Sequence, residues 1–293
     1  MDELDELVPE IKAGKCLVFI GAGVSYYAGC QPWENISKGL FELFNEEEQK
    51  LLLVKYPDLR NKNLREPEKI QIYKEHLGRE RKDKYKAVLS KVCTPTDLKD
   101  PKFISLTNTI SKLTKFYKPL ITTNIDNSLQ GTNAFDRLYY PVRFELPEDF
   151  KLSYLNELGI VHIHGYIENF AKSIFTQEDY DKRYIDPTFR EFIIQALSTF
   201  SVLFIGYSFN DKELQDIFSR IKAKGKGKVM KYYRLVSSNK DFEENKIEAK
   251  EKYNVNLINY GQREELAQVL TSWVDKHFGT IIKPLSDEEI QNI

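Results

Sequence analysis

Two short polar segments carry side chains suited to acid–base chemistry at neutral pH. Thr122–Asp126 (TTNID) places an asparagine and an aspartate two residues apart, and His162–Gly165 (HIHG) holds two of the four histidines. Histidine takes up a proton near neutral pH, and one such base is enough to activate a nucleophile. Asparagine can hold water or a hydroxyl group without adding charge. These residue types suit a site in which a base and an amide act on a polar substrate. Each segment also has a structural explanation, because TTNID has the residues of a helix cap and His-Gly can simply end a strand.

A glycine-containing turn, Gly21-Ala22-Gly23, follows the apolar run Cys16–Ile20. That run is typical of a strand buried on both faces of a parallel sheet. Glycine permits positive φ angles and lets a ligand approach the backbone closely. A helix is expected next, and its free N–H groups would suit a diphosphate. The third glycine of the full dinucleotide fingerprint is absent, so a plain strand-to-helix turn explains the pattern as well.

Two further polar segments also follow apolar runs. Gly206–Asp211 (GYSFND) comes after Leu203–Ile205, and Ser237–Asn239 comes after Tyr233–Val236. Each segment has a structural explanation, because Ser, Asn and Asp commonly cap helices. All of these polar segments lie at the carboxyl ends of expected strands. That position favours a role in ligand binding, since ligands bind beyond the carboxyl ends of the strands in open α/β sheets.

The other apolar patterns predict the elements that position these segments. Strands are expected at Lys118–Thr122, Ile160–Ile163, Ser173–Phe175, Val202–Ile205, Tyr232–Val236 and Val255–Ile258. Helices are expected at 2–14, Trp33–Phe44, Phe103–Leu113, Pro187–Phe200, Lys212–Ile221, Phe242–Tyr253 and Arg263–Phe278. This alternation predicts an α/β fold, a Rossmann-like doubly wound parallel sheet with helices on both faces.

The chain of 293 residues is long for one domain and short for two large ones. Its charge-rich stretch from 46 to about 90 has helical character and is broken at Pro57 and Pro67. We expect a helical insertion at about 44–111 within a single domain spanning 1–293. Basic residues at 79–86 are interspersed with acids, which favours a solvated helix face over a nucleic-acid site.

Composition excludes several classes of protein. Lys and Arg (43) nearly balance Asp and Glu (44), so no global field attracts nucleic acid or anionic membrane. The acidic N-terminus lacks the basic region of a signal peptide, and no apolar run is long enough to span a bilayer. Cys16, Cys30 and Cys93 are far apart, which supports neither a disulfide framework nor a zinc ribbon. We expect a cytoplasmic protein with no bound metal.

Four of these segments together resemble the motifs of the sirtuin-like NAD-binding domain, in order and spacing. They are Gly21–Ser25 (GAGVS), Thr122–Asp126, His162–Gly165 and Gly206–Asp211, within a resemblance that runs from about Lys15 to Asn259. The GYSFND form and the segment Phe175–Tyr180 (FTQEDY) look most like the NAD-hydrolase effectors of bacterial anti-phage defence. Deacetylating sirtuins differ, because they carry a zinc module with two Cys-x-x-Cys pairs. They also carry an Asp-Phe-Arg element where this chain has Gln31-Pro32-Trp33.

The resemblance implies that NAD is the substrate and assigns the chemistry to three residues. Asn124 would hold the nicotinamide ribose or the attacking water, His164 would be the general base, and Asp126 would lie near the nicotinamide amide. On a strand His162 and His164 point to the same side, so spacing alone does not separate them. Only Gly165 and the family motif favour His164.

The resemblance also implies a set of cofactor-binding residues. The diphosphate would lie against the first glycine turn, the GYSFND turn would contact the far side of NAD, and the adenosine half would lie near the last polar segment. The residues are Gly21, Ala22, Gly23, Ser25, Thr123, Gly206, Ser208 and Ser237. We expect NAD to be preferred over NADP.

The implied activity is hydrolysis of NAD to nicotinamide and ADP-ribose, depleting NAD in anti-phage defence. Two alternatives stay open: an NAD-dependent protein modifier, either deacylase or ADP-ribosyltransferase, and a non-catalytic module that senses NAD or ADP-ribose. A toxic hydrolase needs restraint, and only the short segment Gly279–Ile293 follows the last expected helix. We therefore expect control by a homo-oligomer, by a separate sensor or regulatory protein, or by both.

Activity should be independent of zinc, because the sequence offers no His/Cys spacing suited to a tetrahedral site. Treatment with a strong chelator is expected to leave the rate of NAD cleavage unchanged. Metal analysis of the purified protein provides the control, and stoichiometric tightly bound zinc would contradict the prediction.

Overall fold

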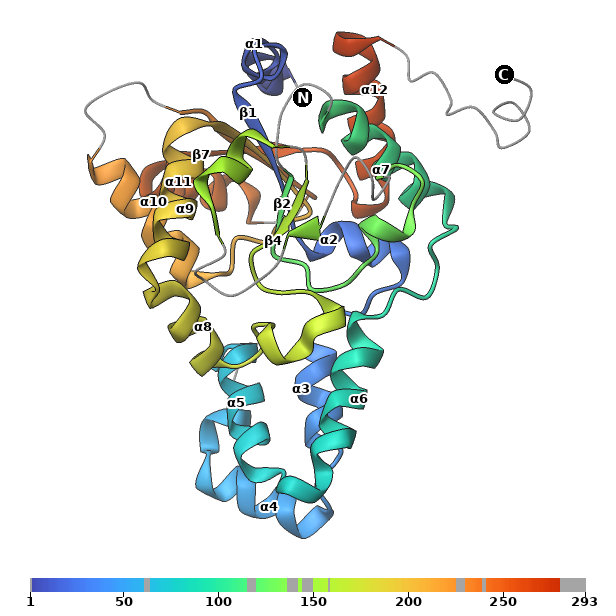
Figure 1. Ribbon diagram of the computed structural model, residues 1–293, viewed down its shortest axis with the longest axis vertical. Coiled ribbons are helices and arrows are strands. Elements are labelled where there is room, and N and C mark those ends of the chain that lie inside the picture. The colour runs from blue at the N-terminus through green and yellow to red at the C-terminus, as the bar shows by residue number, and fades with distance from the viewer. Residues whose placement is uncertain are drawn as a thin grey trace.

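A seven-stranded parallel sheet forms the centre of the molecule (Figure 1), and its strands lie in the order β3-β4-β2-β1-β5-β6-β7. The computed structural model describes residues 2–60, 64–114, 120–135, 142–143, 150–157, 159–224, 230–238 and 241–279. The strands are β1 (Cys16–Ile20), β2 (Leu120–Thr122), β3 (Val142–Arg143), β4 (Ile160–His162), β5 (Ser201–Ile205), β6 (Tyr232–Val236) and β7 (Val255–Asn259). The expected Rossmann-like parallel sheet is confirmed.

Strand β1 lies at the point where the strand order reverses. It pairs with β2 on one side and with β5 on the other, and the chain reaches these neighbours in opposite directions along the sheet. All five residues of β1 and all five of β5 are buried, which explains the unbroken apolar runs Cys16–Ile20 and Val202–Ile205. Ligands bind at such a reversal in open α/β sheets, beyond the carboxyl ends of the strands.

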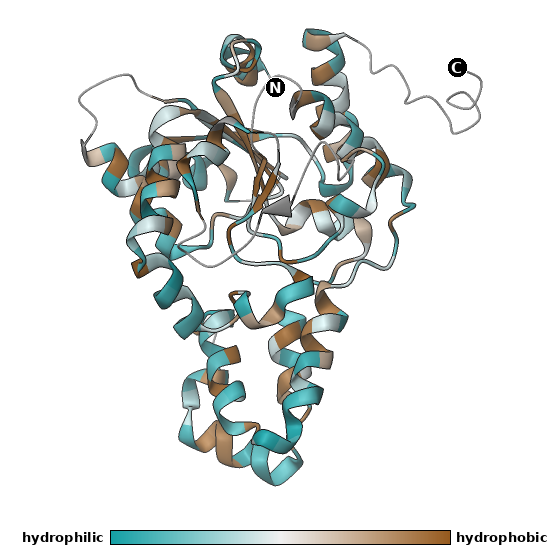
Figure 2. Cartoon of the chain, in the orientation of Figure 1, coloured by the Kyte–Doolittle hydropathy of each residue, from teal (hydrophilic) through white to brown (hydrophobic). Residues whose placement is uncertain are grey.

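Helices cover both faces of the sheet. On one face α1 (Val8–Lys12), α7 (Pro101–Thr114) and α12 (Leu266–Phe278) pack with the strands into one apolar cluster. On the other face lie α8 (Gln177–Ile185), α9 (Pro187–Thr199), α10 (Lys212–Lys224) and α11 (Phe242–Tyr253). Figure 2 shows the strands as an apolar layer between these helices. Among the described residues, no helix is long and apolar enough to cross a membrane.

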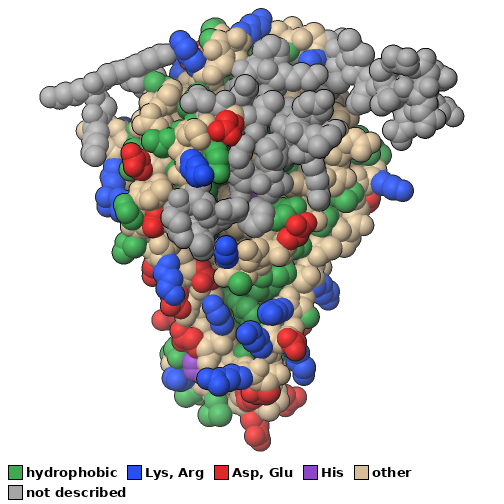
Figure 3. Space-filling model, in the orientation of Figure 1, with side chains coloured by type: hydrophobic (Ala, Val, Ile, Leu, Met, Phe, Trp, Pro, Cys, Tyr) green, Lys and Arg blue, Asp and Glu red, His purple; other side chains and the backbone are tan. Residues whose placement is uncertain are grey.

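A helical lobe extends from one end of the molecule, below the sheet in Figure 1. It consists of α3 (Glu34–Phe41), α4 (Glu46–Lys55), α5 (Glu66–His76) and α6 (Lys82–Cys93). Its helices share an apolar cluster that also takes Ile125 and Phe175 from loops of the sheet domain. Helix α7, inside the stretch expected as an insertion, packs instead on the sheet domain against α12. Basic and acidic side chains intermingle on the lobe surface (Figure 3).

The expected strand at Ser173–Phe175 is wrong. Its apolar residues lie in a loop and enter different clusters, because Ile174 packs under the sheet and Phe175 packs in the helical lobe. Helix α8, which was not expected, begins immediately afterwards with a capping box between Thr176 and Asp179. Strand β3 was also missed, since two residues give no periodic signal. Lys118 and Pro119 of another expected strand lie outside the described residues.

The turns after β1 and β5 are in direct backbone contact. The N–H of Gly21 donates to the carbonyl of Ile205 at 3.0 Å, and the N–H of Gly23 donates to that of Gly206 at 2.8 Å. A Cβ on Gly23 would lie 2.8 Å from the Gly206 Cα, and one on Gly206 would lie 2.6 Å from the Val24 nitrogen. Gly206 also has a φ of +65°, which favours glycine. Contact between the two turns therefore requires glycine on both sides.

Replacing Gly23 by alanine should destabilise the protein by about 1–3 kcal/mol, because the added methyl group meets backbone atoms that cannot rotate away. Urea unfolding monitored by circular dichroism measures this change. Gly39→Ala in α3 is the matched control, since its Cβ would meet only the Val88 side chain, 2.9 Å away. A Gly23→Ala protein as stable as the Gly39→Ala protein would contradict the close contact.

Candidate active site

Asn124 connects the first glycine turn to the end of β2. Its Nδ2 donates to the carbonyl of Gly21 at 3.1 Å and to Ser25 Oγ at 2.7 Å, and its backbone N–H donates to Thr122 Oγ1 at 3.0 Å. Its Oδ1 is buried and has no hydrogen-bond partner among the described residues. A buried acceptor without a partner costs about 1–3 kcal/mol, so this oxygen suits a ligand hydroxyl or a water molecule.

Asp126 belongs to the same cluster of polar groups. Its Oδ1 accepts from the backbone N–H of Ser128 at 3.0 Å, and Ser128 Oγ lies 3.1 Å from Ser25 Oγ. Burial raises the pKa of the Asp126 carboxyl above its ordinary value, although hydrogen bonds from Ser128 and Ser25 act in the opposite direction. A 3-10 turn, Leu129–Gly131, follows directly. The contact to Ser128 therefore also serves the local turn.

His162 is a fully buried residue whose two ring nitrogens are both occupied. Its Nδ1 lies 2.6 Å from the Asn124 carbonyl and its Nε2 lies 2.7 Å from Gln130 Nε2. The proton therefore sits on Nδ1, and Nε2 accepts from the Gln130 amide. Burial lowers the pKa of His162 from 6.5 to about 4, with the hydrogen bond to Asn124 acting against it. The ring is neutral at pH 7 and supports the loop that carries Asn124.

His164 has different surroundings, so the expectation that both histidines point to the same side is wrong. Strand β4 ends at His162 and the next two residues form a turn, in which the Gly165 N–H donates to the His162 carbonyl at 3.3 Å, so the alternation of side chains is lost. His164 Nε2 lies 2.8 Å from the hydroxyl of Tyr184 in α8 and 3.3 Å from Asp211 Oδ2. Its Nδ1 makes no hydrogen bond to any residue that the structure describes.

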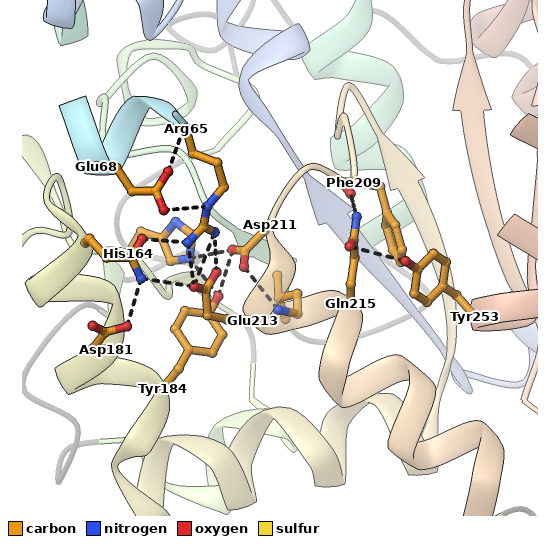
Figure 4. Close-up of polar contacts among 12 residues, drawn as sticks. Arg65, Glu68, His164, Asp181, Tyr184, Phe209, Asp211, Glu213, Gln215 and Tyr253 are labelled. Atoms are coloured by element: carbon orange, nitrogen blue, oxygen red, sulfur yellow. Dashed lines mark hydrogen bonds and ion pairs between the residues drawn. The ribbon is translucent and has the colours of Figure 1, made fainter. Parts of the chain in front are cut away.

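Figure 4 shows the polar residues around His164. Asp211 Oδ1 caps α10 by accepting from the Leu214 N–H at 3.0 Å, so the helix fixes the carboxylate. Nearby, Arg65 from the helical lobe pairs with Glu213 (3.2 Å) and donates to Gln177 Oε1 (2.6 Å). The group of His164, Tyr184 and Asp211 thus lies where α8, α10 and the lobe meet.

The other expected site residues lie around these two clusters or apart from them. Thr123 donates its N–H to the Ile20 carbonyl at 3.3 Å, at the carboxyl end of β1. Ala22 is exposed beside Gly23 at the start of the short helix α2 (Ala22–Ser25). Ser208 is exposed, and Ser237 hydrogen-bonds the Tyr260 side chain. Neither Ser208 nor Ser237 forms a hydrogen bond with Asn124 or His164 within the described parts of the chain.

Sequence reasoning missed several residues that complete the site. Tyr184 carries no local motif, because it reaches the site from α8. Ser128 and Gln130 lie in the turn just after the TTNID segment and outside its motif. Asp211 belongs to the GYSFND motif and was expected to suit a helix cap. The cap is confirmed, and its second oxygen, for which no role was expected, faces His164. No group of three or more His, Cys, Asp or Glu residues in the described ranges is arranged to hold a metal ion.

Comparison with known protein families finds one family model that matches part of the chain. Residues 118–258 match the family model for the SIR2-like domain, whose members use NAD. The match contains Asn124, Asp126, His164 and Asp211, and it begins well after the Gly21–Gly23 turn. No curated protein matches the sequence.

The buried neutral state of His162 predicts a loss of stability in acid. Its folded pKa of about 4 lies below its ordinary value of 6.5, so the unfolded chain takes up the proton first as the pH falls. Its stabilising contribution is complete above pH 6.5 and decreases down to pH 4, with about 2 kcal/mol lost between pH 7.5 and pH 5. The free energy of unfolding in urea, measured at pH 7.5 and at pH 5, tests this prediction.

Two variants isolate the contribution of His162 to this pH dependence. His162→Gln should no longer show this loss of stability in acid, although the variant is less stable than the unaltered protein at pH 7.5. His76→Gln, which alters a partly exposed histidine of the helical lobe, should keep it. The assignment fails if the His162→Gln protein loses as much stability in acid as the unaltered protein does.

Proposed function

We propose, from the SIR2-like domain that residues 118–258 form, that the protein is an NAD hydrolase that releases nicotinamide and ADP-ribose. The observation that carries the proposal is a pair of unengaged polar atoms at neighbouring strand ends. Asn124 Oδ1 and His164 Nδ1 have no partner among the described residues. Asn124 and His164 each lie two residues beyond Thr122 and His162, which pair across β2 and β4.

The requirements of NAD cleavage match these two residues. Nicotinamide is a cation in NAD and leaves as a neutral molecule with the electrons of the glycosidic bond, so no general acid is needed. The difficulty lies in stabilising the ribosyl cation and in bringing a nucleophile to it. His164 Nδ1 would accept the proton of the attacking water, and Asn124 Oδ1 would accept a hydrogen bond from that water or from a ribose hydroxyl. Asp126 would lie near the nicotinamide amide.

The diphosphate would lie against the turn after β1. Close contact with Gly206 already explains why residues 21 and 23 are glycines, so the glycines themselves are not evidence for a diphosphate site. The evidence for the diphosphate position is its place in the sheet. Ala22 is exposed and Gly23 is partly exposed there, at the reversal of strand order where such sheets bind nucleotides. Thr123, Ser25, Gly206, Ser208 and Ser237 complete the set of residues proposed to bind NAD.

We place this activity in bacterial defence against phage, where hydrolysis would deplete the NAD of an infected cell. Such an enzyme needs control, and we propose that a homo-oligomer or a separate regulatory protein provides it. Incubation with NAD alone tests the activity. Free hydrolysis supports the proposal, whereas turnover only with a protein acceptor indicates a protein modifier, and binding without turnover indicates a sensing module.

Asn124→Ala and His164→Ala should each reduce nicotinamide release by about a hundredfold or more, because each removes a group that acts on the nucleophile. Nicotinamide release by purified variants measures this, and thermal unfolding identifies any misfolded variant. His76→Ala in the helical lobe is the control and should retain full activity. A folded, inactive His162→Ala protein beside an active His164→Ala protein would show that the base is assigned to the wrong histidine.

A further inference from the structure

The three polar groups of His164, Tyr184 and Asp211 form a closed triangle. His164 Nε2 lies 2.8 Å from Tyr184 Oη and 3.3 Å from Asp211 Oδ2, and the Tyr184 hydroxyl donates to the same Oδ2 at 3.0 Å. The side chains of His164 and Asp211 are 3% and 6% exposed, so water does not compete strongly for these contacts. Such a group can fix the position of a proton.

The hydrogen bonds determine which nitrogen of His164 carries the proton. The Tyr184 hydroxyl gives its single proton to Asp211, which leaves its oxygen able to accept. The carboxylate of Asp211 can only accept. Both neighbours of His164 Nε2 are therefore acceptors, so Nε2 carries the proton and Nδ1 keeps its lone pair.

Titratable and charged groups from four segments surround this triangle. Helix α8 contributes Tyr180 and Tyr184, the start of α10 contributes Asp211 and Glu213, the turn after β5 contributes Tyr207, and the helical lobe contributes Arg65. Burial raises the pKa of Asp211, but its interaction with His164 and the hydrogen bonds from the Leu214 N–H and Tyr184 outweigh burial and hold the pKa below its ordinary value. Burial raises the pKa of Tyr184 well above 10. Both groups thus keep the protonation states assigned above.

We propose that Asp211 and Tyr184 are positioning residues that hold His164 with its proton on Nε2 and so present Nδ1 as the base. Both are held firmly, because Asp211 caps α10 and Tyr184 stacks on Tyr180 with ring centroids 6.0 Å apart. The effect of these two residues on catalysis rests on the proposed function. The position of the proton is a property of the protein alone.

Asp211→Asn tests the proposal with little change in shape. The Leu214 N–H needs an acceptor, so the cap holds the amide oxygen of the new asparagine toward α10 and directs its NH2 toward His164. A donor at that position moves the proton of His164 to Nδ1 and removes the base. Nicotinamide release should fall by about a hundredfold to ten-thousandfold. The KM for NAD should change little, because neither residue is placed against the substrate.

A matched control separates this effect from helix capping. Asp186 caps α9 by accepting from the Phe189 N–H at 2.9 Å and has no contact with a histidine. Asp186→Asn should therefore keep full activity. Tyr184→Phe keeps the ring but removes one acceptor from Nε2, and it should reduce the rate by about tenfold, the value of one hydrogen bond.

Nitrogen NMR of the imidazole rings gives a measurement that does not depend on activity. The resonances of His164 are assigned by comparison with His164→Gln, and above pH 8 they should show the proton on Nε2 in the unaltered protein. Asp211→Asn should show it on Nδ1, and if that variant fails to fold, the unaltered protein and Tyr184→Phe decide the question. A proton on Nδ1 in the unaltered protein, or full activity in a folded Asp211→Asn protein, would overturn the proposal. An unaltered protein inactive on NAD, with the proton on Nε2, would instead refute the hydrolase function.

Discussion

Backbone contact between the turns after β1 and β5 is the constraint on which the rest of the site depends. The Gly21 N–H reaches the end of β5, and the Gly23 N–H reaches the Gly206 carbonyl at 2.8 Å. From one side of this contact, the Gly21 carbonyl holds the Asn124 amide. From the other side, the chain continues from Gly206 to Asp211, which faces His164. A larger residue in either turn would separate the two polar clusters.

The two histidines of the HIHG segment are both buried, and their different neighbours give them different roles. His162 is neutral because it lies in an apolar site where Gln130 donates to its second nitrogen. His164 Nε2 instead lies 3.3 Å from Asp211 Oδ2, so this buried ring has a carboxylate beside it. A base needs that second environment, since a buried ring without a counter-charge resists protonation. The pair thus divides into a structural residue and a residue suited to proton transfer.

The sequence was sufficient to predict six of the seven strands and part of the site. Strands β1 and β5 lie where the sequence has short apolar runs, because burial on both faces selects such runs. Ser173–Phe175 failed because the same kind of run also occurs in a loop that fills two separate cores. Tyr184 could not be found, since its hydroxyl meets His164 only through the packing of α8 against the sheet domain. Periodicity predicts burial, but it does not predict which buried polar groups meet.

The helical lobe is joined to both halves of the site. Ile125, between Asn124 and Asp126, packs in the apolar cluster of the lobe, and its carbonyl accepts from the Ile167 N–H at 2.7 Å. Arg65 at the start of α5 pairs with Glu213, two residues beyond Asp211. Any displacement of the lobe must therefore either break these contacts or carry Asn124 and α10 with it. Because interior packing is dense, side chains so joined adopt a few discrete arrangements and do not shift gradually. The geometry around His164 and Asn124 is in this way tied to the position of a surface some distance from the sheet.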